Sequence, residues 1–176
     1  LGSPVVLGEG MAPDGVPAER WVRCPNLRNA YPDLAARLAG DPSSELTVIG
    51  VTGTDGKTTV SWLISELLSA VDGVPCGRVG TLGASWGKGW AQPGFTTPPA
   101  AILQPIFAQM VADGVCTVVI EVSSHAIALA RIAGVHFGAG VLTTLGRDHL
   151  DFHGDLETYH QTKLGFLSAL PDGTPI

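Results

Sequence analysis

The stretch LTVIGVTGTDGKTT at residues 46–59 decides the fold class. It starts with a short, β-branched apolar run at 46–51 and continues through a glycine-rich turn at 53–56. The following residues, 57–70, carry apolar side chains at the three- and four-residue spacing of a helix. The stretch therefore predicts a buried strand, a tight loop and a helix, in that order.

The glycine-rich turn has the composition of a phosphate-binding loop. Glycines allow several backbone N–H groups to turn toward one point, and the helix N-terminus adds positive potential there. Lys57 is placed to reach the β- and γ-phosphates, and the hydroxyl of Thr58 is placed to bind Mg²⁺. Val51 stands where the strict form of the motif has glycine, and a glycine-rich turn without a ligand is the competing interpretation. The predicted nucleotide-binding residues are Gly53, Thr54, Asp55, Gly56, Lys57, Thr58 and Thr59.

Further along the chain, short apolar runs alternate with helical segments. We expect a helix from 98 to about 113, a strand at 116–122, a short helix at 124–130, a strand at 139–143 and a helix at 156–170. Strands that alternate with helices are typical of parallel sheets, whose crossover helices cover both faces. The predicted fold class is α/β, with a mainly parallel sheet and helices on both faces.

The first 45 residues differ in composition from the rest of the chain. They are rich in glycine and proline, with a short apolar run at 5–7 and a helical stretch at 31–38. The turn-forming segment Asp-Pro-Ser-Ser at 41–44 marks a linker or boundary. We expect 1–44 to be the remnant of one domain, irregular in structure, and 45–176 to belong to another.

Composition excludes several classes of protein. The 176 residues are 45% hydrophobic, which provides enough apolar surface for a core. Sixteen acidic against ten basic residues give a net charge of −6, which argues against nucleic-acid partners. No apolar run reaches transmembrane length, so no membrane association is expected. Cys24, Cys76 and Cys116 are scattered, which favours a reducing cytoplasmic location over a disulfide framework.

Polar residues gather after two of the expected strands. Glu121 ends an apolar strand and is either a solvated carboxylate or a Mg²⁺ ligand; His125, four residues later, is equally ambiguous. The loop at 144–154 holds two histidines, two aspartates and one arginine, which fits a metal site or a surface turn. Lys163 lies on the last expected helix, where a lone lysine is usually solvated.

Four motifs in this order resemble the Mur ligase family, and within it most closely the MurE type. They are GTDGKTT at 53–59, TTP at 96–98, EVSSH at 121–125 with Arg131, and RDHLDFHG at 147–154 with Lys163. The resemblance covers residues 21–170 and implies a P-loop central domain at 45–176. It also implies that 1–44 is what remains of an N-terminal UDP-substrate domain, and that the C-terminal domain is absent from this sequence, so that the chain is a fragment.

The resemblance implies ATP-dependent amide-bond formation in peptidoglycan synthesis. An amino acid would be added to UDP-MurNAc-L-Ala-D-Glu through an acyl phosphate, with ATP and Mg²⁺ as cofactors. Lys57, His149 and Lys163 would be catalytic; the metal ligands would be Thr58, Glu121, His149 and Lys163, the last as a carbamate. Substrate would be bound by Thr96, Thr97, Ser123 and Arg131.

Three positions depart from the family pattern. Asp55 stands where the family usually has asparagine, Thr144 replaces the asparagine of a T-N-L element, and Leu129 stands where relatives can carry glutamine. These departures, with the short length, keep a non-catalytic nucleotide-binding module as an alternative; a folate- or cyanophycin-type ligase and a small-molecule kinase are further alternatives. The amino acid added and the oligomeric state are not specified by any residue pattern in the chain.

Overall fold

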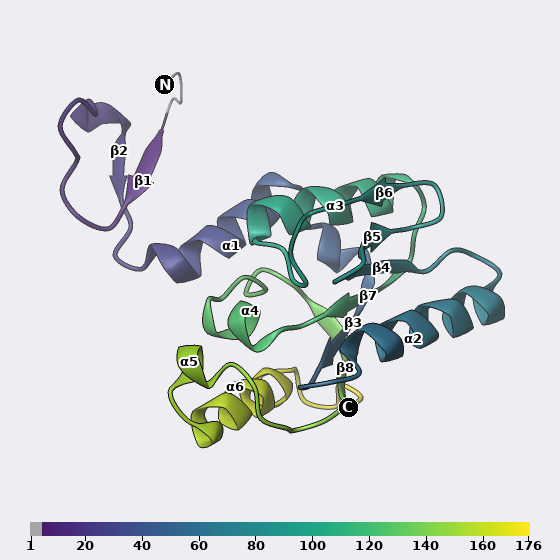
Figure 1. The fold of residues 1–176 in the computed structure, drawn as a ribbon. Helices are drawn as coiled ribbons and strands as arrows, with labels where there is room; N and C mark the ends of the chain where they lie inside the picture. The colour runs from purple at the N-terminus through teal and green to yellow at the C-terminus, as the bar shows by residue number, and fades with distance from the viewer. Residues whose placement is uncertain (1–4) are drawn as a thin grey trace.

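The computed structural model describes residues 5–176, which form a six-stranded sheet flanked by helices (Figure 1). The strands are β1 (Val6–Gly8), β2 (Trp21–Arg23), β3 (Thr47–Thr52), β4 (Gly77–Gly80), β5 (Gly83–Ser85), β6 (Trp90–Ala91), β7 (Thr117–Glu121) and β8 (Phe137–Leu142). The helices are α1 (Leu27–Leu38), α2 (Lys57–Asp72), α3 (Ala100–Ala112), α4 (Ser124–Ala128), α5 (Leu150–His153) and α6 (Leu156–Ser168), with short 3₁₀ turns η1 (Ala18–Arg20) and η2 (Pro42–Ser44). No helix within residues 5–176 has the length and apolar character needed to cross a bilayer.

The centre of the sheet is parallel, as predicted. The strand order is β6-β5-β4-β7-β3-β8, and β4, β7, β3 and β8 pair in parallel. In this register Val51 of β3 lies beside Glu121 of β7, and Thr52 lies beside Leu142 of β8. The carboxyl ends of the three strands therefore meet at one edge of the sheet, where ligands bind in open α/β folds.

An antiparallel extension was not predicted. β5 pairs antiparallel with β4, and β6 pairs antiparallel with β5. The sequence of β4 is Gly-Arg-Val-Gly, which has too few apolar or β-branched residues to stand out as a strand. β4 is held in the extended conformation by its hydrogen bonds to β7, and not by its own residue preferences.

The main core lies on the sheet face covered by α3. Leu103, Phe107 and Met110 of α3 are fully buried and pack in one cluster with Val118 and Ile120 of β7. α6 adds two further side chains to the same cluster, Phe166 and Leu167. Figure 1 shows α1 and α3 together on this side and α2 on the other, which confirms the predicted helices on both faces.

Helix α2 buries small polar side chains rather than its apolar ones. Ser61 and Ser65 are buried where α2 packs on β7 and β4, whereas Leu63 and Leu67 are 47% and 64% exposed. Serines allow the helix to approach the sheet closely, and their hydroxyls donate to the helix's own carbonyls of Thr58 and Trp62. The helix was predicted correctly, but its apolar spacing does not mark the buried face.

The N-terminal segment contains regular structure that was expected to be irregular. β1 and β2 form a parallel pair that stands off from the main sheet in Figure 1. By contrast, α1 packs on α3, and Pro42 and Ser43 of η2 are buried, with Ser43 Oγ accepting from the backbone N of His136 at 3.1 Å. Residues 27–44 are therefore packed on the sheet domain, and a domain boundary at residue 44 stays a prediction.

Candidate functional site

The predicted phosphate loop lies between β3 and α2. Gly53 has φ +145°, and a Cβ at this position would lie 1.9 Å from Thr143 Oγ1, so only glycine fits here. Lys57 folds over the loop, with Nζ donating to the carbonyls of Gly53 at 2.9 Å and Thr54 at 2.8 Å. The loop, the N-terminus of the 16-residue helix α2 and one ammonium group are thus gathered at the sheet edge.

Two threonines after β8 hold the phosphate loop from the other side. The backbone N of Asp55 donates to Thr144 Oγ1 at 2.9 Å, and that of Thr54 donates to the carbonyl of Thr144 at 2.9 Å. Thr143 Oγ1 donates to the carbonyl of Asp55. Thr144, one of the departures from the family pattern, therefore makes structural contacts here, while the side chain of Asp55 is exposed.

Glu121 ends β7 directly beside this loop. Its side chain is 1% exposed, and Oε2 accepts a hydrogen bond from Thr58 Oγ1 at 2.9 Å. The Glu121 carboxylate and the Thr58 hydroxyl together provide hard oxygen ligands of the kind that Mg²⁺ prefers. These two predicted metal ligands are brought together, and the donor set fits the ion.

The four predicted substrate residues also lie together, on the other side of Glu121. Thr97 is buried, its Oγ1 donates to the carbonyl of Glu121 at 2.8 Å, and it accepts from the backbone N of Ser123 at 3.0 Å. Arg131 Nη1 donates to the carbonyl of Thr97 at 3.1 Å, which directs the guanidinium to the same place. Thr96, the residue before Thr97, forms a hydrogen bond with Thr81, at 3.1 Å between the two hydroxyl oxygens. Thr81 is not part of any of the four motifs.

Thr81 was missed by sequence reasoning. It lies in the turn between β4 and β5, and both its backbone N and its hydroxyl donate to the carboxylate of Glu121. No local pattern marks it, because its role depends on β4 lying next to β7. Only knowledge of that pairing could have singled it out.

His149, the N-cap residue of α5, lies in a cluster of aromatic rings with residues of α4 and α5. The ring centroids of His149 and His125 are 4.6 Å apart, and Phe152 packs on His125 at 4.2 Å. Burial, and then neighbouring positive charges, lower the pKa of His125 and of His153. No group of three or more His, Cys, Asp or Glu side chains in the described part of the chain has metal-binding geometry by itself.

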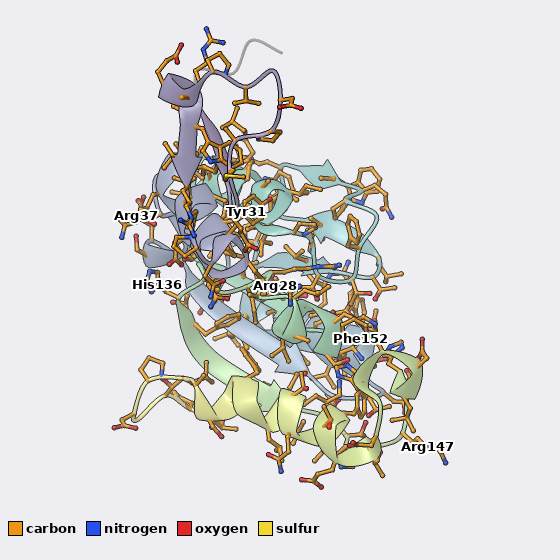
Figure 2. All side chains as sticks on the ribbon, turned by 90° about the vertical axis from the view of Figure 1, so that its left-hand side faces the viewer. Arg28, Tyr31, Arg37, His136, Arg147 and Phe152 are labelled. Carbon is orange, nitrogen blue, oxygen red and sulfur yellow. The ribbon has the colours of Figure 1, made fainter. Side chains whose placement is uncertain are left out.

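Arg147 of the same loop does not take part in this cluster. It is exposed, and Figure 2 shows it pointing away from the domain, while Phe152 lies next to α4, where it packs on His125. The concentration of charged residues at 144–154 is thus divided between an inward cluster and an outward surface.

Lys163 is buried at the site rather than solvated. Its side chain is 1% exposed, Nζ donates to the carbonyl of Gly53 at 2.9 Å, and it lies 4.5 Å from the centroid of the Tyr159 ring. Burial, with a further contribution from the charge of Lys57, lowers the pKa of Lys163 to about 8. Two lysines thus donate to the same loop carbonyl, and one of them has a readily accessible neutral form.

Tyr159 connects the last helix to the phosphate loop. Its hydroxyl donates to Thr54 Oγ1 at 3.0 Å, and Thr54 Oγ1 also accepts from the backbone N of Gly146 at 2.8 Å. The loop is therefore fixed by α6 and by the segment after β8.

Comparisons with known proteins agree with this arrangement. The family profile described as the Mur ligase middle domain matches residues 51–176. The chain is 45% identical over 165 residues to UDP-N-acetylmuramyl-tripeptide synthetase of Deinococcus radiodurans, covering 92% of this chain and 34% of that protein. It is 49% identical over 139 residues to UDP-N-acetylmuramoyl-L-alanyl-D-glutamate--2,6-diaminopimelate ligase of Chlamydia abortus, covering 79% of this chain and 29% of that protein.

Solved structures share this fold. A UDP-N-acetylmuramoyl-L-alanyl-D-glutamate--2,6-diaminopimelate ligase superposes with a TM-score of 0.76 at 32% identity, covering 90% of this chain and 31% of that one. A folylpolyglutamate synthase of Mycobacterium tuberculosis, complexed with ADP and AMPPCP, shares the fold with a TM-score of 0.64 at 17% identity, over 83% of this chain and 40% of that one. The chain spans about a third of the length of the curated relatives it matches. With a family profile that matches most of its residues, the chain belongs to the Mur ligase family.

Proposed function

We propose that this chain is the nucleotide-binding part of a cytoplasmic, ATP-dependent ligase that adds an amino acid to UDP-MurNAc-L-Ala-D-Glu. The observation that carries the proposal is the hydrogen bond between Thr58 of the phosphate loop and the buried carboxylate of Glu121. A hydroxyl and a carboxylate in contact beside the predicted phosphate loop support Mg²⁺ binding there, because Mg²⁺ prefers oxygen ligands next to nucleotide phosphates. The names of the MurE-type relatives supply the substrate class.

The nucleotide side of the site would act through Lys57 and the loop amides. Triphosphate oxygens would replace the loop carbonyls of Gly53 and Thr54 as partners of Lys57 Nζ. A phosphate at the N-terminus of α2 also gains from the aligned peptide dipoles of that helix. These groups would hold the γ-phosphoryl in place for transfer.

Thr58 and Glu121 would hold Mg²⁺ through their hydroxyl and carboxylate oxygens. When bound, this ion neutralises phosphate charge and so lowers the repulsion of an approaching carboxylate. Glu121 is prepared for this role because it is buried and its carboxylate is already hydrogen bonded.

The acceptor side would be formed by Thr96, Thr97, Ser123 and Arg131. Arg131 is anchored on the carbonyl of Thr97 and lies over the ring of Phe95 at 5.2 Å, so that its charge is held in a fixed place. A fixed cation can screen the carboxylate that receives the phosphoryl group, giving an acyl phosphate that the amine of an amino acid then attacks.

Lys163 would serve as a carbamate, with His149, at a second Mg²⁺. Its neutral amine would add to CO₂, forming an N–C bond and releasing one proton, which converts a cation into an anionic oxygen ligand. The lowered pKa of Lys163 favours this reaction because the neutral amine is the reactive form. In bicarbonate buffer, the intact mass of the active protein would increase by one CO₂ at this residue.

Lys57→Ala tests the nucleotide proposal. We expect titration calorimetry to show that the native chain binds MgATP. The affinity of the variant should be lower by about 100-fold or more, because the hydrogen-bonded ion pair between the lysine and the phosphates is removed. Lys88→Ala is the matched control: Lys88 is exposed and bonds Asp113. Asp55→Asn should bind MgATP as well or better, because an exposed negative charge beside the phosphates is removed.

A non-catalytic nucleotide-binding module is the second candidate, favoured by the acidic side chain of Asp55 in the loop. The two candidates differ in what triggers turnover. In the complete protein that contains this chain, ADP release that depends on UDP-MurNAc-L-Ala-D-Glu supports the ligase. ADP release that is absent with this acceptor and every amino acid, despite tight MgATP binding, supports the module.

A further inference from the structure

Thr81 holds both oxygens of the Glu121 carboxylate. Its backbone N donates to Oε1 at 3.0 Å and its Oγ1 donates to Oε2 at 3.1 Å. The position follows from the sheet: β4 pairs with β7 so that Val79 lies beside Ile120, which places the turn after β4 next to the end of β7. A freely rotating carboxylate is thereby limited to one orientation.

Gly80 also determines where the Glu121 carboxylate lies. A Cβ at position 80 would lie 2.0 Å from Oε1 of Glu121 and 2.6 Å from its Cδ. The carboxylate therefore packs directly against bare backbone, and any larger residue at position 80 would displace it. Gly80 and Thr81 together set where the carboxylate lies and how it is turned.

The proton of the Thr81 hydroxyl is committed to Glu121. A hydroxyl carries one proton, so the 3.1 Å contact between Thr81 Oγ1 and Thr96 Oγ1 requires Thr96 to be the donor. Hydroxyl protons thus point along one line from Thr96 to Thr81 to Glu121. At the far end, Oε2 of the same carboxylate also accepts from Thr58 of the phosphate loop.

We propose that Thr81 is a positioning residue that orients Glu121 for the metal-bearing nucleotide and links this carboxylate to the acceptor-side loop through Thr96. The inference rests on the proposed function, since it assumes that Glu121 faces Mg²⁺ and a nucleotide. It assigns a role to a turn residue outside every recognised motif. Its specific consequence is that the Mg²⁺-dependent part of nucleotide binding depends on the hydroxyl of Thr81.

The test compares ADP affinity in Mg²⁺ and in EDTA, measured by calorimetry on the native chain and on Thr81→Val, Thr81→Ser and Thr162→Val. The ratio of the two affinities isolates the contribution of the metal. We expect Thr81→Val to lower this ratio about five- to tenfold, the size of effect that the loss of one hydrogen bond typically has. Thr81→Ser keeps the hydroxyl and should restore the ratio. Thr162→Val removes a hydroxyl on α6 that bonds only its own helix at Thr158, and it should change nothing.

A second pair of variants tests the link to Thr96. Thr96→Val should lower the ratio about twofold, because it removes a more distant, solvent-accessible hydrogen bond. In the double variant with Thr81→Val, Thr96→Val should not lower the ratio further, because the Thr81 hydroxyl that links Thr96 to Glu121 is already absent. Thermal melts confirm that each variant is folded, and Thr96→Val carries the test if Thr81→Val unfolds.

The outcomes separate this inference from the proposed function. A native chain that binds no ADP in either buffer refutes the proposed function and this inference with it. Normal binding in which Thr81→Val keeps the full Mg²⁺ ratio, or in which Thr81→Ser loses as much as Thr81→Val, overturns this inference alone. A loss in Thr81→Val that Thr81→Ser restores supports it.

Discussion

Two glycine-rich segments of this chain, the phosphate loop at 53–59 and the strand pair β1–β2, differ in what holds them in place. The loop is bonded to residues far away in the sequence: Thr144 and Lys163 contact it across 89 and 110 positions. The strand pair is held mainly by its own residues, with the ring of Trp21 over Gly8 and its indole N–H donating to the carbonyl of Gly10 at 3.3 Å.

The two segments also differ in how far their residues are exposed to solvent. Gly53 and Glu121 at the loop are buried, whereas Val22 in β2 is 48% exposed and Met11 in the connecting segment is 93% exposed. An isolated pair of strands is only marginally stable in water. The difference indicates that glycine content alone does not decide rigidity, and that long-range hydrogen bonds fix the segment that carries the chemistry.

The largest expected effect comes from adding one methyl group to the loop. Gly53→Ala should lower the free energy of unfolding by about 4 kcal/mol, because the new Cβ meets Thr143 and φ +145° is strained for alanine. Gly10→Ala in the N-terminal segment is the control, since nothing lies within 4 Å of its Cβ position. Urea unfolding followed by circular dichroism measures both; equal effects of the two variants would contradict the comparison.

The next effect depends on pH. Because burial holds the folded-state pKa of Lys163 near 8, below the ordinary value of 10.5, the unfolded chain binds the proton more tightly. Stability should therefore rise as pH increases from about 8 to 10.5, by about 2–3 kcal/mol relative to Lys163→Met. Urea unfolding in CO₂-free buffer at pH 7.5, 9 and 10 gives the difference between the two chains. A native chain whose stability does not rise relative to Lys163→Met would show that Lys163 is not buried as described.

The smallest effect is expected in the N-terminal pair. Trp21→Ala should change the free energy of unfolding of the sheet domain by less than about 0.5 kcal/mol, the range of surface substitutions. It should nevertheless speed proteolysis within residues 5–26, because the pair loses its main internal contact. Val118→Ala in β7, where the side chain is fully buried, should cost about 2 kcal/mol by comparison. If Trp21→Ala costs as much as Val118→Ala, the pair is part of the main folding unit.

Local sequence patterns were sufficient where one segment determines its own structure. The apolar run of β3, the glycines of the loop and the spacing of α2 predicted a strand, a tight loop and a helix at nearly their observed bounds. The sequence also showed polar residues at the end of β7 and after β8, and the parallel register of both strands with β3 brings these residues to one edge of the sheet.

Features that depend on pairing could not be predicted in this way. β4 is recognisable as a strand only beside β7, and Thr81 has a role only because that pairing brings it to Glu121. The burial of Lys163 follows from α6 packing over the loop, whereas its helix alone gave no reason to expect a buried lysine. The buried face of α2 was also hidden, because serines rather than leucines pack on the sheet.

The most direct test of the central claim is amide hydrogen exchange on the native chain with and without MgATP. We expect slower exchange at the amides of 53–59 when MgATP is added, because the phosphates would accept hydrogen bonds from this loop. The amides of β1 and β2 should exchange at the same rate in both conditions, since they lie apart from the site (Figure 1). Slower exchange confined to the N-terminal pair, or no change anywhere at saturating MgATP, would contradict the assignment of residues 53–59 as the nucleotide site.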